Sequence, residues 1–203
     1  MNTLISGFRR NLVIVLVILF LLSQAVIFYP ALANDPGLPE WWMVVSNLLL
    51  ISIPLTLLYG SLYMVIMAWR EHTLSGAVEP RLAKSIHWAA RVAVMVIGSF
   101  LSLFSFDVFE LQAPPLELLG GFLVHNIPTI ALIVLLIFAW KRPAVGFVAF
   151  LVAGMLFAVF FVRDFYALPN LMLFVLPILL IAALFYVDWK WLEPSRLLSA
   201  QEN

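Results

Sequence analysis

The sequence predicts an all-α, polytopic transmembrane helical bundle of about six spans, with both termini on the inner side of the membrane. Three observations lead to this prediction. Hydrophobic residues make up 65% of the 203 residues and charged residues 11%, whereas a soluble domain is typically about 45–50% apolar and about 25% charged. The apolar residues fall into runs of about 20, the length of a membrane-crossing helix. The Lys and Arg residues gather between alternate runs, as they do in inner loops.

Six apolar runs divide the chain, and each is expected to form a helix because lipid cannot satisfy open backbone groups. The runs cover about residues 11–30, 42–69, 86–106, 119–140, 144–162 and 170–187. Most prolines lie at or between the ends of these runs. Pro54, Pro128 and Pro177 lie inside them, where the missing backbone N–H is expected to bend the helix.

The first run allows a second interpretation. Arg9-Arg10, an apolar run and then Ala31-Leu32-Ala33 are similar to a signal peptide with a small-residue cleavage site. The run from Leu12 to Phe28 is longer than the usual apolar region of about 7–15 residues, and Pro30 suits the end of a span equally well. Whether residues 1–33 are cleaved stays open. Cleavage would leave five spans in the same orientation.

Basic residues set the predicted orientation. With the N-terminus inside, nine of the eleven Lys and Arg residues fall in inner segments: Arg9, Arg10, Arg70, Arg81, Lys84, Lys141, Arg142, Lys190 and Arg196. The outer loops instead carry acidic residues: Asp35, Glu40, Asp107, Glu110, Glu117 and Asp164. Because short inner loops are enriched in Lys and Arg, both termini are predicted to be cytoplasmic.

One face of the third run is polar and small, and its positions lie within roughly 60° of one another at about 100° per residue. That face carries Lys84, His87, Arg91, Gly98, Ser102 and Ser105. It is expected to meet neighbouring helices, since small residues allow close approach. Two interpretations of Arg91 stay open: its side chain snorkels to the inner interface, or it projects into a polar inner cavity. In the second case Arg91, His87 and Lys84 form a candidate site for an anionic group or a lipid headgroup.

A polar layer is predicted near the outer surface. Gly121, His125 and Thr129 share a face of the fourth run by i, i+4, i+8 spacing, so that His125 is expected to face other helices. Other polar residues at this level or just above it are Gln24, Asn47, Asn126, Asp107, Glu110, Arg163 and Asp164. These groups either satisfy one another's hydrogen bonds, or form a small outward-facing pocket in which His125 exchanges a proton with Asp107 or Glu110.

No catalytic, metal or cofactor site is predicted. The chain has no cysteine, which excludes disulfides and thiolate ligands. His87 is expected near the inner end of the third span and His125 in the outer part of the fourth. Most of the membrane thickness then separates them, so they cannot bind one metal ion together. No HExxH pair, P-loop or Gly-x-Ser-x-Gly elbow occurs. No cofactor and no nucleic-acid partner is expected, and an enzymatic role is left uncertain.

The fifth run carries Gly146, Ala149 and Ala153 at a helical spacing. Small residues so placed let helix backbones approach closely. This face is therefore predicted to pack either within the chain or against another subunit. The expected partners are membrane lipids, other membrane subunits or further copies of the chain.

Three stretches carry a resemblance: HWAARVAVMVIGSFLSLFSFDVFE, GFLVHNIPTIALIVLLIFAWKRPAVGF and LPNLMLFVLPILLIAALFYVDW. Over about residues 82–189 the chain resembles an uncharacterised family of small four-span membrane proteins of bacteria and archaea. The matching positions are Arg91, Asp107, His125, Pro128, Ala139 and Trp140. The resemblance implies a prokaryotic cell membrane and no particular activity. It divides the chain into a two-helix N-terminal extension with an inner loop (1–81), a four-helix transmembrane unit (82–189) and a short inner tail (190–203).

Three hypotheses of function follow from these features. The first is a multi-pass structural or accessory membrane subunit, indicated by the small-residue faces. The second is a small permease or ion-coupled carrier that uses the outer polar layer around His125 and Asp107. The third, and the weakest, is a membrane enzyme that acts on lipid, with Arg91 or His125 near a headgroup, because no nucleophile and base can be paired.

Overall fold

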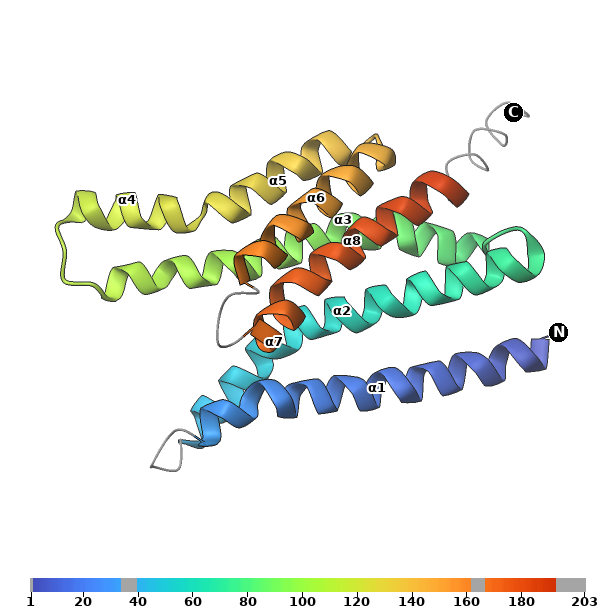
Figure 1. Cartoon of the computed structure of the whole chain (residues 1–203), viewed down its shortest axis with the longest axis horizontal. Helices are drawn as coiled ribbons and strands as arrows, with labels where there is room; N and C mark the ends of the chain where they lie inside the picture. Colours follow the sequence, from blue (N-terminus) through green and yellow to red (C-terminus); the bar gives the residue numbers. More distant parts are fainter. Residues whose placement is uncertain (1, 34–39, 162–166, 193–203) are drawn as a thin grey trace.

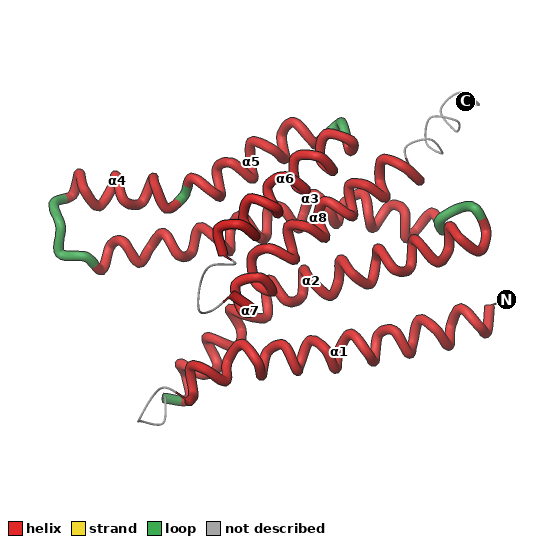
Figure 2. The backbone as a smooth tube through the Cα atoms, viewed as in Figure 1, coloured by secondary structure: helices red, strands yellow, loops and turns green. Residues whose placement is uncertain are grey.

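The chain forms a bundle of helices, described by a computed structural model over residues 2–33, 40–161 and 167–192 (Figure 1). The elements are α1 (Asn2–Ala33), α2 (Trp41–Ser75), α3 (Pro80–Leu103), α4 (Pro115–His125), α5 (Ile127–Ala139), α6 (Pro143–Phe161), α7 (Ala167–Asn170) and α8 (Leu176–Val187), with the 3₁₀ helix η1 (Phe104–Glu110) and the π-helical turns η2 (Leu171–Val175) and η3 (Asp188–Leu192). The described ranges contain helices, turns and loops without strands (Figure 2). The predicted all-α fold class is confirmed.

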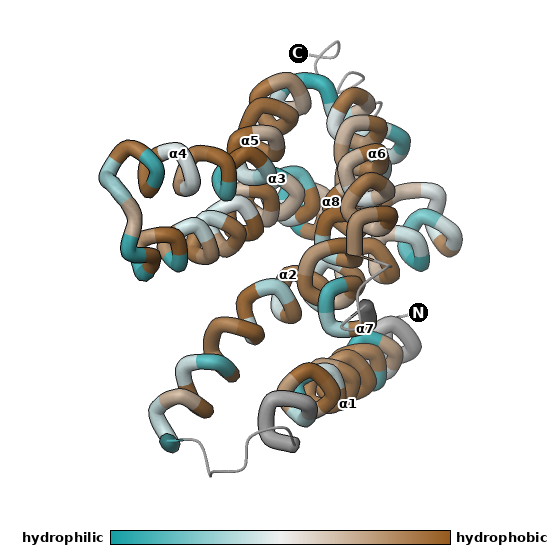
Figure 3. The backbone as a smooth tube through the Cα atoms, turned by 60° about the vertical axis from the view of Figure 1, so that its left-hand side comes forward, coloured by the Kyte–Doolittle hydropathy of each residue, from teal (hydrophilic) through white to brown (hydrophobic). Residues whose placement is uncertain are grey.

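The helices are long and apolar enough to cross a membrane. In the described residues, five helical segments have the length and hydropathy of a membrane span, or six if the bent pair α4 and α5 is counted as one span. Most of the helical residues are hydrophobic (Figure 3), and many of their large apolar side chains are exposed on the outside of the bundle. Because lipid is as apolar as these side chains, such a surface suits a bilayer and not water. The chain is therefore an integral membrane protein by length and composition.

The core lies around α8 and α3. Helix α8 packs against α2, α3 and α6, and α3 also packs against α5. The fully buried residues include Ile97 of α3, Ile181 of α8 and Phe150 of α6. Helix α1 lies at the edge of the bundle beside α2 (Figure 1).

Two ends of the bundle differ in charge. The start of α1, the α2–α3 turn, the α5–α6 turn and the end of η3 lie together at one end (Figure 1), which we call the basic end. Besides the buried Arg91, its described Lys and Arg residues are Arg9, Arg10, Arg70, Arg81, Lys84, Lys141, Arg142 and Lys190. The opposite end carries Glu40, Asp107, Glu110 and Glu117. Asp35, Arg163, Asp164 and Arg196 lie outside the described residues.

The predicted bend near Pro128 is confirmed. Helices α4 and α5 meet at Asn126 with an angle of 45°, and Pro128 stands in the first turn of α5. Pro177 stands in the first turn of α8, directly after the π-helical turn η2. Pro54 lies inside α2, which is one helix from Trp41 to Ser75.

Charged side chains join α1 to the α2–α3 turn at the basic end. One guanidinium nitrogen of Arg9 lies 2.7 Å from Glu71 and 3.1 Å from Glu79. Glu71 also accepts a hydrogen bond from the backbone N–H of Glu79 at 2.9 Å. The Arg70 guanidinium lies 3.6 Å from the ring centroid of Phe8. These contacts link the start of α1 to the α2–α3 turn.

The small-residue face of the fifth run packs within the chain. A Cβ atom at Gly146 would lie 2.6 Å from the buried Phe185 ring, and Ala153 of the same predicted face packs against the core. Gly154 was not part of the predicted face, and a Cβ atom there would lie 2.5 Å from Leu179. Phe185 in turn stacks on Phe150, with ring centroids 5.5 Å apart. Glycine is therefore required where α6 crosses α8, because any side chain would force the two helices apart.

We expect Gly146→Ala to lower the free energy of unfolding by about 1–3 kcal/mol, because the new methyl group overpacks a buried ring that cannot turn aside. Gly120→Ala is the matched control, since nothing lies within 4 Å of a Cβ at that position and alanine is the better helix former. The measurement is thermal or detergent-induced unfolding, followed by circular dichroism. Equal unfolding midpoints for the two variants would contradict the close α6–α8 contact.

Candidate functional site

The side chain of Arg91 lies inside the bundle at its basic end. Arg91 belongs to the polar face of α3 and is 1% exposed. Its Nη1 lies 3.2 Å from Oδ2 of Asp188, and its Nη2 donates a hydrogen bond to the backbone carbonyl of Trp140 at 2.8 Å. Nη1 also donates to the backbone carbonyl of His87. Neither sequence interpretation of Arg91 describes this arrangement, because the anion that faces the guanidinium is a carboxylate of the same chain.

Asp188 joins two side chains of α3 to α8. It is fully buried at the first residue of η3, directly after the end of α8. Its Oδ2 accepts a hydrogen bond from Nδ1 of His87 at 2.8 Å and faces Arg91. The side chain of His87 is 28% exposed, so it lies between this carboxylate and the surface. We call Arg91, Asp188 and His87 the charge cluster.

Aromatic rings surround the charge cluster. The Arg91 guanidinium lies 5.9 Å from the ring centroid of Trp140 and 5.5 Å from that of Phe185. Trp191 of η3 stacks on His72 at the end of α2, with centroids 4.6 Å apart. Rings so placed keep water from a buried charge and attract the cation through their faces. The rings of Trp140 and Phe185 therefore flank the buried guanidinium.

The local sequence explains why these groups meet. Arg91 follows His87 by four residues, so both stand on one face of α3. Trp140 is the C-cap residue of α5, at a helix end where backbone carbonyls have no donor within the helix. The Arg91 guanidinium supplies that donor. The arrangement holds a paired charge inside the bundle, and Oδ2 of Asp188 is shared between His87 and Arg91.

Asp188 is the residue that the sequence analysis did not single out. The acidic residues that drew attention there stood in the outer loops, and the inner end was judged from its Lys and Arg residues alone. A signal was nevertheless present: Asp188 is the single acidic residue in the apolar segment Leu168–Leu192. An acid at such a place requires a partner inside the protein, and Arg91 is the buried cation available to it.

The prediction that His125 faces other helices is wrong. Its side chain is exposed, and its Nδ1 donates a hydrogen bond to the carbonyl of Gly121 in its own helix at 2.9 Å. Helical spacing shows which residues share a face, but it does not show how far a neighbouring element extends along that face, and α4 contains no buried residue. Gly121 and Thr129 do face neighbours, with Gly121 against Val108 and Thr129 against Gly98.

The other members of the predicted polar layer fall into separate places. Asn126 accepts a hydrogen bond from Ser102 at 3.0 Å, and Ser102 also contacts Thr129 at 3.3 Å. Gln24 donates to Ser52 at 2.7 Å, between α1 and α2. The side chains of Asn47, Asp107 and Glu110 are exposed. The structure therefore gathers Asn126 with α3 and Gln24 with α2, and brings neither to His125.

The predicted anion-binding residues are likewise separated. His87 and Arg91 belong to the charge cluster, whereas the side chain of Lys84 is exposed one turn nearer the basic end. Across the described residues, no group of three or more His, Cys, Asp or Glu side chains is placed to hold a metal ion. Among the described ionisable side chains, Arg91 and Asp188 of the charge cluster are buried.

Fold and site together define a class: a multi-pass membrane protein whose helices are joined by an internal ion pair. Residues 79–198 match the family described as "domain of unknown function (DUF7670)". This match covers more than half of the chain, so the chain belongs to that family. The predicted membership in a family without an assigned function is confirmed. Its four-span organisation and its prokaryotic range stay predictions. No curated protein and no solved structure matches the chain.

We expect Asp188→Leu to lower the free energy of unfolding by about 3–5 kcal/mol, because it takes the carboxylate away from a buried guanidinium. The double variant Arg91→Met/Asp188→Leu should lose less than Asp188→Leu alone, since no buried cation then remains. Unfolding midpoints in a mild detergent measure both effects.

The control for this pair is Glu79→Gln, which breaks a contact at the same end of the bundle. The side chains of Arg9 and Glu79 are 40% and 46% exposed, and exposed pairs of this kind contribute about 0–1 kcal/mol. Two results would contradict a stabilising role of the ion pair. One is a loss of unfolding free energy for Asp188→Leu as small as that for Glu79→Gln, and the other is a double variant less stable than Asp188→Leu.

Proposed function

We propose that this chain is a non-enzymatic accessory subunit that packs against a transmembrane helix of a partner protein. The observation that carries the proposal is an open groove between α1 and α2, with a volume of about 230 Å³. Its lining includes Thr56, Gly60 and Tyr63 of α2 and Val13 and Val17 of α1.

Gly60 makes this groove suitable for close packing against another transmembrane helix. Nothing lies within 4 Å of a Cβ placed at Gly60, so its backbone is open to a neighbour. Thr56 precedes it by four residues, and both are exposed. Two small residues at i and i+4 are the spacing with which transmembrane helices approach each other closely. The chain itself leaves this site uncovered in its described part.

The two helices that form the groove are held by hydrogen bonds within the membrane. The hydroxyl groups of Ser23 and Tyr59 lie 2.6 Å apart. Because Ser23 donates to the carbonyl of Leu19 at 2.8 Å, Tyr59 supplies the proton for the shared bond. The neighbouring residue Gln24 forms a second link, to Ser52 of α2. The groove is thus preformed, and a partner helix would order few further side chains on binding.

The carrier hypothesis receives less support. It needs His125 and Asp107 to face a common pocket, and both side chains are exposed at the surface. The hydrogen bond of His125 goes to Gly121. An enzyme acting on lipid would need Arg91 or His125 at a headgroup, whereas the Arg91 guanidinium is enclosed beside Asp188.

The accessory-subunit proposal predicts a complex that depends on Gly60. Native mass spectrometry of the protein extracted gently from its own membrane should find it with another polypeptide. Gly60→Leu should lower the fraction of chain in that complex at least several-fold, because the side chain fills the space of the approaching backbone. Gly120→Leu is the matched control, since its surroundings are equally open. A lone chain in the native extract, or a complex unchanged by Gly60→Leu, would contradict the proposal.

The proposal also includes the orientation predicted from the sequence, with the basic end in the cytoplasm. The chain has no cysteine, so one introduced cysteine is the sole target of a maleimide. Ala77→Cys lies in the α2–α3 turn and Gln112→Cys in the η1–α4 loop, and both positions are exposed. In intact cells a membrane-impermeant maleimide should label Gln112→Cys but not Ala77→Cys. It should label Ala77→Cys only after the cells are permeabilised. The opposite labelling pattern would reverse the orientation.

A further inference from the structure

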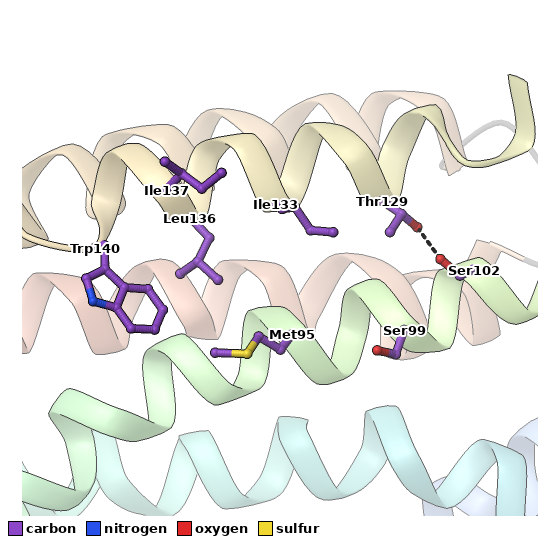
Figure 4. Close-up of a pocket in the computed structure, with 8 residues that line it drawn as sticks. All are labelled: Met95, Ser99, Ser102, Thr129, Ile133, Leu136, Ile137 and Trp140. Carbon is purple, nitrogen blue, oxygen red and sulfur yellow. Dashed lines mark hydrogen bonds between the residues drawn. The ribbon is translucent and has the colours of Figure 1, made fainter. Parts of the chain in front are cut away.

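A second groove runs along the surface between α3 and α5, with a volume of about 490 Å³ (Figure 4). Met95, Ile133 and Ile137 line its length, with Ser102 and Thr129 at one end and Trp140 at the other. Met95, Ile133 and Ile137 are 43%, 45% and 67% exposed. Since these side chains lie on the membrane-facing side of spanning helices, the groove opens toward lipid.

The length of the groove matches one leaflet of a bilayer. Thr129 and Trp140 are eleven residues apart on α5, which is about 16 Å at about 1.5 Å per residue. The hydrocarbon core of a bilayer is about 30 Å thick, so one leaflet contributes about half of that. A single extended acyl chain therefore fits from the basic end to the polar pair Ser102 and Thr129.

Aromatic and basic side chains stand where a headgroup would lie. The rings of Trp88 and Trp140 meet edge to face at the basic end of the groove, with centroids 6.5 Å apart. Tryptophan pairs of this kind favour the headgroup level. Lys84 precedes Trp88 by one turn on the same face of α3, and Lys141 and Arg142 directly follow Trp140; all three are exposed.

The nearby acidic side chains do not cancel this charge. Glu71 and Glu79 contact Arg9, and Asp188 is enclosed in the charge cluster. The mouth of the groove is therefore positive. A basic side chain near the membrane surface strengthens the binding of an anionic headgroup by about fivefold.

We propose that the α3–α5 groove binds one anionic glycerophospholipid from the leaflet at the basic end. One acyl chain lies along Met95, Ile133 and Ile137. The phosphate lies against Lys84, Lys141 and Arg142, beyond the Trp88–Trp140 pair. This site is separate from the α1–α2 groove, so the lipid proposal and the partner proposal can fail independently.

The test uses the whole chain, freed of lipid in a neutral detergent and titrated with phosphatidylglycerol or with phosphatidylcholine of the same acyl chains. Native mass spectrometry measures the first binding event. The wild-type chain should bind phosphatidylglycerol at least fivefold more tightly. Lys84→Gln/Lys141→Gln should weaken phosphatidylglycerol about 5- to 25-fold and leave phosphatidylcholine unchanged. The charge-matched control is Arg10→Gln/Lys190→Gln, because both side chains are exposed and lie on α1 and η3, away from the groove.

A second pair of variants tests the acyl-chain part of the groove. Ser99→Phe places a ring in the groove and should weaken both lipids, whereas Val148→Phe on the exposed face of α6 should weaken neither. Equal affinity for the two lipids in the wild-type chain would overturn the proposal. So would an equal loss in the two charge variants, or binding that Ser99→Phe leaves unchanged. Because every substituted side chain is exposed, unfolding midpoints near wild type are expected for all four variants.

Discussion

The arrangement of the helices at the basic end depends on one buried cation, the guanidinium of Arg91. A charge that is 1% exposed inside an apolar bundle is stable only with an anion and with acceptors for its remaining N–H groups. Asp188 supplies the anion, and the carbonyls of Trp140 and His87 accept from the same guanidinium. Because these groups come from the ends of α8, α5 and α3, all three helices must reach the same level. Few other positions of α5 relative to α3 would give the Trp140 carbonyl its donor.

Away from this end, the helices are joined by weaker contacts of two kinds. Ser102, Asn126 and Thr129 link α3 to α5 at the break in the fourth span, where the Thr129 hydroxyl donates to the carbonyl of Gly98 at 3.2 Å. Such hydrogen bonds between membrane helices contribute about 0.6 kcal/mol each on average. Gly146 and Gly154 join α6 to α8 by shape, with no polar group involved. The residues at the α4–α5 break thus join two helices by hydrogen bonds, whereas the glycines of α6 join two helices by close packing.

The limits of sequence reasoning can be seen at particular residues. The spans, the polar face of α3 and the bend near Pro128 could be predicted, because hydropathy, helical period and the missing proline N–H are local properties. The pairing of Arg91 with Asp188 could not, since the two are 97 residues apart and helical period contains no information about distant partners. His125 was misplaced for a different reason: helical spacing shows which residues share a face, but not whether a neighbouring element covers that face, and none of the residues of α4 is buried. The groove between α3 and α5 also depends on two helices, and neither helix shows it alone.

The two outward grooves differ in chemistry, and this difference indicates different occupants. Helices α1 and α5 lie on opposite sides of the bundle (Figures 1 and 3), so the α1–α2 groove and the α3–α5 groove do not compete for space. The first has an open backbone at Gly60 and is held by hydroxyl contacts near it, which suits a closely packed helix. The second has no glycine in its lining and ends at two tryptophans next to basic side chains, which suits a lipid with a charged headgroup. Since the Trp140 carbonyl is held by Arg91, the position of that mouth is fixed by the same buried charge that orders the core.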